Sequence, residues 1–247
     1  MRADLFIDLG NSRIKWRLGA GQPQQAVEYG NGPLDAVLND VWKKLPSPEH
    51  IWLASVAPDR IRRALQSWTS RAWGVIPHVV TVQPEACGVS CGYQDPGQLG
   101  VDRWMAIIAA HDVCPGGACV VDCGTATTLD VLDSNGRHLG GFILPGVTMM
   151  RRILARETGL NPALGVTQSM EWGNSTASCI DLGIYKSVVS LIEQSVERLQ
   201  AAGVCDPGVI LTGGACSLIK PHLQLAHEHR DALVLDGMET FVQEPGK

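Results

Sequence analysis

Two stretches of this sequence, 114 positions apart, share one pattern that decides the fold. The first is Phe6-Ile7-Asp8-Leu9-Gly10-Asn11-Ser12, and the second is Val120-Val121-Asp122-Cys123-Gly124-Thr125-Ala126. Each is an apolar strand with an aspartate near its end, a glycine turn with a small polar residue, and then a returning strand. One such β-hairpin is ordinary, whereas two at equivalent places in the two halves predict a duplicated domain.

The segments around the hairpins alternate as an α/β protein requires. Apolar runs and helical spacing of apolar residues predict strands at 51–56, 78–82 and 209–212, and helices at 61–73, 104–110 and 180–199. Cys114-Pro115-Gly116-Gly117 is the expected break between the halves. We therefore expect an α/β protein of two similar lobes, residues 1–115 and 116–247.

Composition excludes several classes of partner. The net charge of −5 argues against general binding to nucleic-acid phosphates. No apolar run approaches the roughly 20 residues of a membrane-spanning helix, and Asp4 and Asp8 interrupt the region where a signal peptide would be apolar. The eight cysteines form no Cys-x-x-Cys pair, which favours free thiols in a reducing compartment. We expect a cytoplasmic protein with no nucleic-acid and no membrane partner.

The two hairpins are candidate phosphate sites. A tight glycine turn directs several backbone N–H groups to one side, and Ser12 or Thr125 adds a hydroxyl donor. Asp8 or Asp122 can hold a hydrated Mg²⁺ or another cation, and Lys15 can supply a positive charge. Either hairpin alone also fits an ordinary Asx-type turn. Together they favour a nucleotide bound between two lobes.

A second candidate site lies where the apolar helix at 104–110 begins. Gly100 precedes it, so Asp102 and Arg103 fall in or beside its first turn. An aspartate is favoured there by the helix dipole alone, but an arginine is not, unless an anion needs it. An anionic substrate with a hydroxyl to be phosphorylated would use both, Asp102 to accept the proton and Arg103 to hold a carboxylate. Further along, Arg151, Arg152 and Arg156 predict a basic helix face.

In these motifs the sequence resembles type III pantothenate kinases, a branch of the superfamily of sugar and acetate kinases, actin and heat-shock chaperones. The resemblance covers nearly the whole chain, and Gly100-Val101-Asp102-Arg103-Trp104 is its most telling motif. The others are Asp8 to Ser12 with Lys15, Ser55-Val56-Ala57-Pro58, Gly92-Tyr93, 122–130, 140–146 and Leu211-Thr212-Gly213-Gly214. It implies two similar ribonuclease-H-like lobes, the duplicated actin-like ATPase fold, with the active site in the cleft between them.

The resemblance also implies roles for individual residues. Asp102 matches the proton acceptor, and Asp122 matches the ligand of an activating monovalent cation, K⁺ or NH₄⁺. Asp8 is the candidate for Mg²⁺ held through water. The positions that match ATP contacts are Asp8, Gly10, Asn11, Ser12, Lys15 and Thr125. The positions that match pantothenate contacts are Tyr93, Gly100, Val101, Asp102, Arg103 and Thr176.

The implied function is ATP-dependent phosphorylation of pantothenate to 4'-phosphopantothenate, the first step of coenzyme A biosynthesis, by a homodimer. Two alternatives stay open. One is a transcriptional accessory or regulatory protein that keeps the kinase fold, although the chain has no helix-turn-helix signature and no basic stripe. The other is a sugar or acetate kinase of the same superfamily, which would need a different segment from Tyr93 to Arg103.

Overall fold

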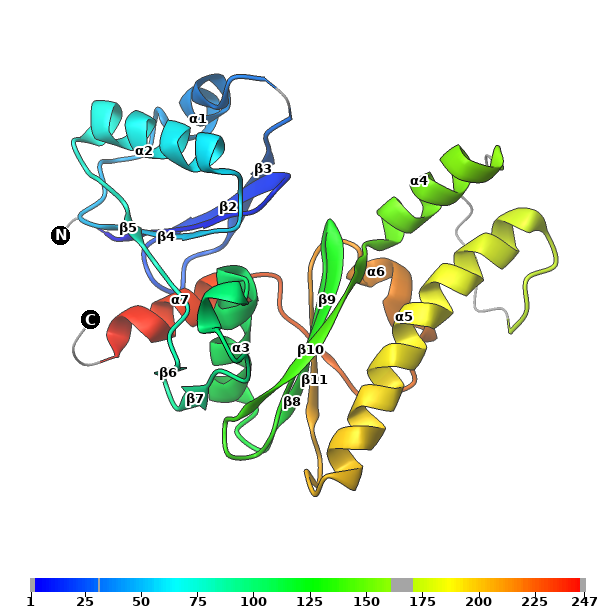
Figure 1. Ribbon diagram of the computed structural model, residues 1–247. Coiled ribbons are helices and arrows are strands. Elements are labelled where there is room, and N and C mark those ends of the chain that lie inside the picture. The colour runs from blue at the N-terminus through cyan, green and yellow to red at the C-terminus, as the bar shows by residue number, and fades with distance from the viewer. Residues whose placement is uncertain (1–2, 31, 161–170, 245–247) are drawn as a thin grey trace. The chain divides into compact units, whose positions relative to one another are not determined.

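The computed structural model describes residues 3–30, 32–160 and 171–244, and it divides into two compact units (Figure 1). The first unit comprises Met1–Asp112 and Ala232–Lys247, and the second comprises Val113–Asp231. The first division lies three residues before the one expected after residue 115. The C-terminal segment differs from the expectation, since 116–247 was predicted to form one lobe but its last residues belong to the first unit.

The first unit is built on a five-stranded sheet in the order β3-β2-β1-β4-β5. Its strands are β1 (Leu5–Leu9), β2 (Arg13–Leu18), β3 (Gln25–Glu28), β4 (Ile51–Ser55) and β5 (His78–Val79). Strands β1, β2 and β3 are antiparallel neighbours, whereas β4 is parallel to β1 and β5 is parallel to β4. Only two residues of the strand predicted at 78–82 pair with the sheet.

Helices α1 (Leu34–Trp42) and α2 (Asp59–Trp73) cover one face of this sheet (Figure 1). Their apolar sides meet in a cluster of indole rings. The Trp42 ring centroid lies 5.7 Å from those of Trp16, Trp68 and Trp73. Edge-to-face and stacked rings at this distance add to the free energy of apolar burial. A few large aromatic residues therefore anchor this core, alongside buried aliphatic residues such as Leu38 and Leu65.

Helices α3 (Val101–Val113) and α7 (Leu233–Gln243) lie on the other face of the first sheet (Figure 1). Between β5 and α3 the chain forms the ribbon β6 (Glu85–Ala86) and β7 (Val89–Ser90) and the short helix η1 (Pro96–Gln98). Helix α7 contacts β1. Gly237 of α7 is so close to α3 that an added Cβ would lie 1.8 Å from the Met105 carbonyl oxygen. This close packing explains why the C-terminal segment belongs to the first unit.

The second unit repeats the first, strand for strand. Its strands are β8 (Ala118–Cys123), β9 (Ala126–Leu132), β10 (His138–Pro145), β11 (Gly208–Thr212) and β12 (Glu228–His229). They take the order β10-β9-β8-β11-β12, with the same alternation of antiparallel and parallel neighbours. The duplicated α/β fold predicted from the two hairpins is confirmed.

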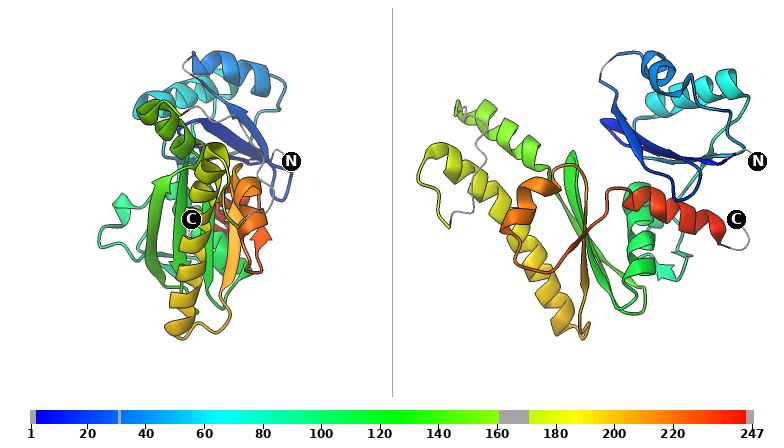
Figure 2. Two further views of the ribbon diagram at one scale, coloured as in Figure 1. Left: turned by 90° about the vertical axis from the view of Figure 1, so that its right-hand side faces the viewer. Right: turned by 180° about the vertical axis from the view of Figure 1, so that it is seen from behind.

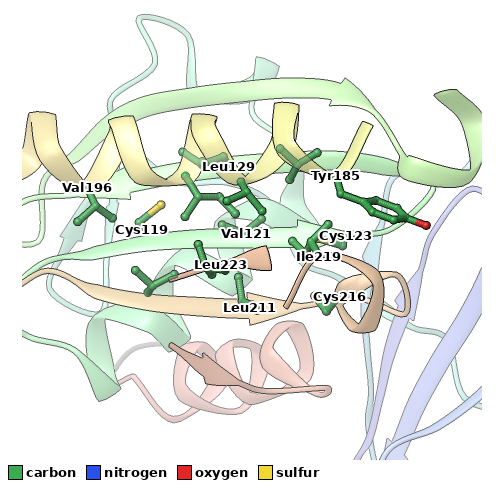
Figure 3. Close-up of a cluster of buried hydrophobic side chains, with 14 of the residues drawn as sticks. Cys119, Val121, Cys123, Leu129, Tyr185, Val196, Leu211, Cys216, Ile219 and Leu223 are labelled. Carbon is green, nitrogen blue, oxygen red and sulfur yellow. The ribbon is translucent and has the colours of Figure 1, made fainter. Parts of the chain in front are cut away.

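The helices of the second unit are α4 (Val147–Thr158), α5 (Thr176–Ala201), α6 (Cys216–Ile219) and the short helix η2 (Lys220–His222). Helix α5 runs along one face of the sheet (Figure 2). Its residue Val196 lies near Cys119 and its residue Tyr185 near Cys123, and all four belong to the buried core of this unit (Figure 3). Helix α5 begins about one turn before the helix predicted at 180–199.

All eight cysteines lie in the described part of the chain, and all are free thiols. Cys119, Cys123 and Cys216 are buried, and burial raises the pKa of Cys119 to about 12. A thiol that stays protonated is a poor nucleophile and metal ligand. Across the described residues, no three His, Cys, Asp or Glu side chains gather as a metal cluster would require. None of the described helices has the length and apolar character to cross a membrane.

Candidate functional site

The β1–β2 hairpin carries the first predicted phosphate turn. Antiparallel pairing places Lys15 opposite Asp8, and the Lys15 Nζ lies 3.5 Å from the Asp8 Oδ2. Asp8 is buried, whereas Asn11 and Ser12 at the tip are exposed. The Gly10 N–H donates to the Arg13 carbonyl oxygen at 3.0 Å and closes the turn. A buried carboxylate beside an ammonium group and an exposed polar tip suit a phosphate with its cation.

Tyr29, directly after β3, supports this turn and was not predicted from the sequence. Its hydroxyl donates to the Gly10 carbonyl oxygen at 2.5 Å, and its backbone N–H donates to the Ser12 carbonyl oxygen at 3.2 Å. Burial raises the pKa of the Tyr29 hydroxyl, while the charge of Arg60 opposes that rise. The hydroxyl therefore stays protonated as a donor. No local motif marks Tyr29, because its hydrogen-bond partners, Gly10 and Ser12, lie in the turn between β1 and β2 and are distant from it in the sequence.

The second group of predicted residues lies at the start of α3. The Trp104 N–H donates to the Gly100 carbonyl oxygen at 3.0 Å, so the helix begins directly after Gly100. The Asp102 Oδ1 accepts from the Arg103 N–H at 2.8 Å. A Cβ at Gly100 would lie 2.6 Å from that same Oδ1. The absence of a side chain at position 100 therefore makes room for the Asp102 carboxylate.

Two opposing influences act on Asp102. Burial is the larger, and it raises the pKa of the carboxyl group. The hydrogen bond from the Arg103 backbone and the charges of Arg103 and Lys15 lower it. Lys15 on β2 is therefore near enough to the start of α3 for its charge to lower the pKa of Asp102, and both belong to the first unit. A carboxylate with a raised pKa is a better proton acceptor than an ordinary one.

Arg103 is buried, with 7% of its surface exposed. Its Nη1 donates to the Tyr93 hydroxyl at 3.0 Å, and its guanidinium carbon lies 5.7 Å from the Tyr93 ring centroid. Val101, the first residue of α3, is buried beside it. A cation is disfavoured in the first turn of a helix, so its burial here needs an electrostatic reason. Arg103 and Tyr93 together present donors of the kind that can bind a carboxylate.

The β8–β9 hairpin repeats the arrangement in the second unit. Asp122 lies opposite Thr128 on β9 and beside Thr212 on β11. Gly213 has a φ of +92°, and a Cβ there would lie 2.3 Å from the Asp122 Oδ1. The carboxylate is thus packed against backbone that only glycine permits at this φ. These residues fit a hard cation, which takes carboxylate and carbonyl oxygens as ligands.

Thr125 lies at the exposed tip of this second hairpin. The Gly146 N–H donates to the Thr125 carbonyl oxygen at 3.1 Å. A Cβ at Gly146 would lie 2.5 Å from the carbonyl oxygens of both Gly124 and Thr125. Gly146 therefore allows the start of α4 to pack directly on the turn that carries Thr125.

Thr176 is the first residue of α5 and is exposed. A capping box between Ser175 and Ser178 fixes the helix start, with the Ser175 hydroxyl accepting from the Ser178 N–H at 3.2 Å. Thr176 also lines a cavity of about 990 Å³ between α4 and α5, whose apolar walls include Met150 and Ile180. Of the predicted site residues, Asp122 and Thr125 share one turn in the second unit, while Thr176 stands apart at the start of α5.

Comparisons with known proteins agree with these features. A sequence model of the family described as type III pantothenate kinase matches residues 4–198. The chain is 33% identical to a type III pantothenate kinase of Nitrosococcus oceani, over 98% of this chain and 95% of that protein. It is 38% identical to a type III pantothenate kinase of Halorhodospira halophila, over 95% of each.

Solved structures share the fold at low sequence identity. A Baf family protein of Campylobacter jejuni superposes with a TM-score of 0.67 and 20% identity, over 97% of this chain and 98% of that one. MreB5 of Spiroplasma citri bound to AMPPNP superposes with a TM-score of 0.53 and 14% identity, over 98% of this chain and 96% of that one. The actin-like character of the fold is therefore confirmed.

Proposed function

Because this chain belongs to the type III pantothenate kinase family, we propose that Asp102 accepts the proton of the pantothenate hydroxyl as its oxygen attacks the γ-phosphate of ATP. The enzyme phosphorylates pantothenate with ATP, in the first step of coenzyme A biosynthesis. The observation that carries the role of Asp102 is its setting at the start of α3, where burial raises its pKa and Gly100 makes room for its carboxylate.

The chemistry asks little basicity of this group. In phosphoryl transfer the bond to the leaving group is largely broken before the new bond forms, so the hydroxyl loses its proton late. A carboxylate near the attacking oxygen is then sufficient as the acceptor. Most of the rate comes from alignment and from neutralising charge on the phosphoryl group. On this proposal, Lys15 opposes the negative charge of the phosphates in the first unit.

We place the carboxylate of pantothenate at Arg103 and Tyr93, because a buried guanidinium group and a phenol hydroxyl are matched donors. Gly100 and Val101 shape the same end of α3. This assignment separates the proposal from a sugar kinase, since a neutral sugar offers no carboxylate to Arg103. The regulatory alternative is not favoured, as the curated relatives are pantothenate kinases.

ATP is assigned to the two hairpin turns. In the first, Asp8, Gly10, Asn11, Ser12 and Lys15 form the turn, and in the second Thr125 forms the tip. The nucleotide bound to MreB5, whose fold this chain shares, supports the assignment. Asp8 would hold Mg²⁺ through water, and Asp122 would hold K⁺ or NH₄⁺; bound there, these cations would offset phosphate charge.

We also infer that the enzyme is a homodimer. The second unit exposes large apolar side chains: 79% of Trp172, 65% of Ile143 and 39% of Ile153. Ile153 lines the apolar cavity between α4 and α5. Exposed apolar surface of this kind is typical of a protein interface. We propose that a second copy of this chain covers it. Sedimentation of the wild type and of Ile153→Glu tests this, with a monomeric wild type contradicting it.

The eight free thiols support a reducing, cytoplasmic compartment.

One assay tests the proposed activity. ATP consumption is measured with pantothenate, with a panel of sugars and acetate, and with no acceptor. We expect turnover with pantothenate alone. Asp102→Asn should lower kcat by about 10²- to 10⁴-fold, the usual effect of losing a general base, with an unchanged circular dichroism spectrum. A folded variant with near-normal turnover would reject Asp102 as the proton acceptor.

A further inference from the structure

Helix α4 joins two parts of the second unit that the proposed function treats separately. At its start, Gly146 packs on the turn that carries Thr125, and Val147 is fully buried. One helical turn later, Arg151 contacts Asp181 of α5. The same helix is therefore in contact with the second hairpin turn at one end and with α5 a turn further along.

The contact between these helices is a buried ion pair. The Arg151 Nη2 lies 2.9 Å from the Asp181 Oδ1, and Asp181 has 0% of its surface exposed. Neither carboxylate oxygen accepts a well-aligned hydrogen bond from the described residues. Burial raises the pKa of Asp181, and the charge of Arg151 opposes that rise. Of the three arginines predicted to form a basic helix face, Arg151 is half-buried, while Arg152 and Arg156 are exposed.

Stability alone is a weak reason for this pair. Removing two charges from water costs free energy that their attraction only partly returns, so apolar side chains of similar volume often serve a core as well. What an ion pair adds is one preferred arrangement of the two helices, because any other arrangement leaves a charge buried without its partner.

The pair acts on the part of α5 that bears Thr176. Asp181 lies five positions after Thr176 on a continuous helix, and the Ser175–Ser178 capping box fixes the intervening first turn. Helical geometry transmits a fixed position of Asp181 to Thr176, since these residues are about a turn and a half apart.

We propose that Arg151 and Asp181 are positioning residues for pantothenate, which hold Thr176 in a fixed place relative to the hairpin turn at 124–125. Neither residue needs to touch the substrate. The inference rests on the proposed function and on the pantothenate contact that the family resemblance implies for Thr176. It adds a specific claim, namely that the geometry of one substrate contact depends on a buried ion pair between α4 and α5.

The test compares Asp181→Asn, Arg151→Gln and Arg151→Lys with Arg152→Gln, a matched control one position away on the exposed side of α4. Misplacing a contact by about 1 Å costs up to roughly 10²-fold. We therefore expect kcat/KM for pantothenate to fall by about 10- to 100-fold in Asp181→Asn and Arg151→Gln, mainly through KM. The KM for ATP should be unchanged in these variants, and Arg152→Gln should keep the wild-type kcat/KM for pantothenate.

Two further measurements separate positioning from simple stabilisation. The double variant Arg151→Gln with Asp181→Asn removes both charges, so its melting temperature should recover while its KM for pantothenate stays high. The effects of Thr176→Ala and Asp181→Asn on kcat/KM for pantothenate, expressed as free energies, should add up to less than their sum in the double variant, because both remove the same contact. A KM that recovers with the melting temperature, or fully additive effects, would overturn the proposal.

Arg151→Lys keeps the charge but replaces the planar guanidinium group with a single ammonium donor. If the neutral variants fail to fold, Arg151→Lys alone tests the proposal. We expect its KM for pantothenate to rise by less than the change expected for Arg151→Gln, and an unchanged KM would overturn the proposal. Failure of the proposed function would look different from failure of this positioning role, because the wild type would then show no pantothenate-dependent ATP consumption at all.

Discussion

Gly100→Ala is the sharpest test of the carboxylate at the start of α3. Gly100 does not have a positive φ, so alanine is compatible with the backbone there. The added Cβ would lie 2.6 Å from the Asp102 Oδ1, and an ordinary contact begins at 3.4 Å. The carboxylate must therefore move by the difference, about 0.8 Å, away from its present place. Because its hydrogen bond to the Arg103 N–H is 2.8 Å long, that movement also weakens the bond.

A displacement of this size is large for a reacting group. Misplacement by about 1 Å costs up to roughly 10²-fold, so we expect kcat/KM for pantothenate to fall by about 10- to 100-fold. The assay is ADP release at saturating ATP with varied pantothenate, together with thermal unfolding. Gly116→Ala is the control, since a Cβ at that position meets nothing within 4 Å. Normal turnover in a folded Gly100→Ala enzyme would refute the claim that the position of Asp102 limits the reaction.

Three other predictions concern single groups. Tyr29→Phe removes one hydrogen bond to Gly10, which contributes about 0.5–1.5 kcal/mol to the stability of the turn, so the KM for ATP should rise by at most about 12-fold, while Tyr185→Phe leaves it unchanged. Burial raises the pKa of Asp102 above 3.8, and the base must be deprotonated. Activity should therefore fall as the pH drops through that raised pKa, and a pH profile of kcat/KM for pantothenate that lacks this acid limb would contradict the assignment. Asp122→Ala should lose its response to K⁺, and equal wild-type rates in Na⁺ and K⁺ buffers would remove the cation assignment.

The parts of the site predicted from the sequence are those that depend on local structure. A hairpin fixes its own pairing within a few residues, so the opposition of Asp8 and Lys15 follows from their spacing around one turn. The start of α3 is equally local, because Gly100 and Asp102 belong to one helix end. The duplication itself was visible because the two hairpins repeat the same short pattern.

What the sequence did not predict depends on contacts between distant residues. Tyr29 reaches Gly10 from the far side of a three-stranded ribbon, and nothing in its neighbours marks it. Gly237 meets Met105 across 132 positions, so the assignment of α7 to the first unit had no local signal. Arg151 looks the same as Arg152 in the sequence, and only the packing of α4 on α5 distinguishes the buried residue from the exposed one.

The indole cluster around Trp42 has a practical consequence. Six of the seven tryptophans belong to the first unit, and Trp172 alone represents the second. Intrinsic fluorescence on denaturation is therefore dominated by the first unit. With Trp42 replaced by phenylalanine, the solvent-exposed indole of Trp172 becomes a larger share of the emission. Its wavelength and its quenching by iodide then become an optical probe of what covers that surface in solution.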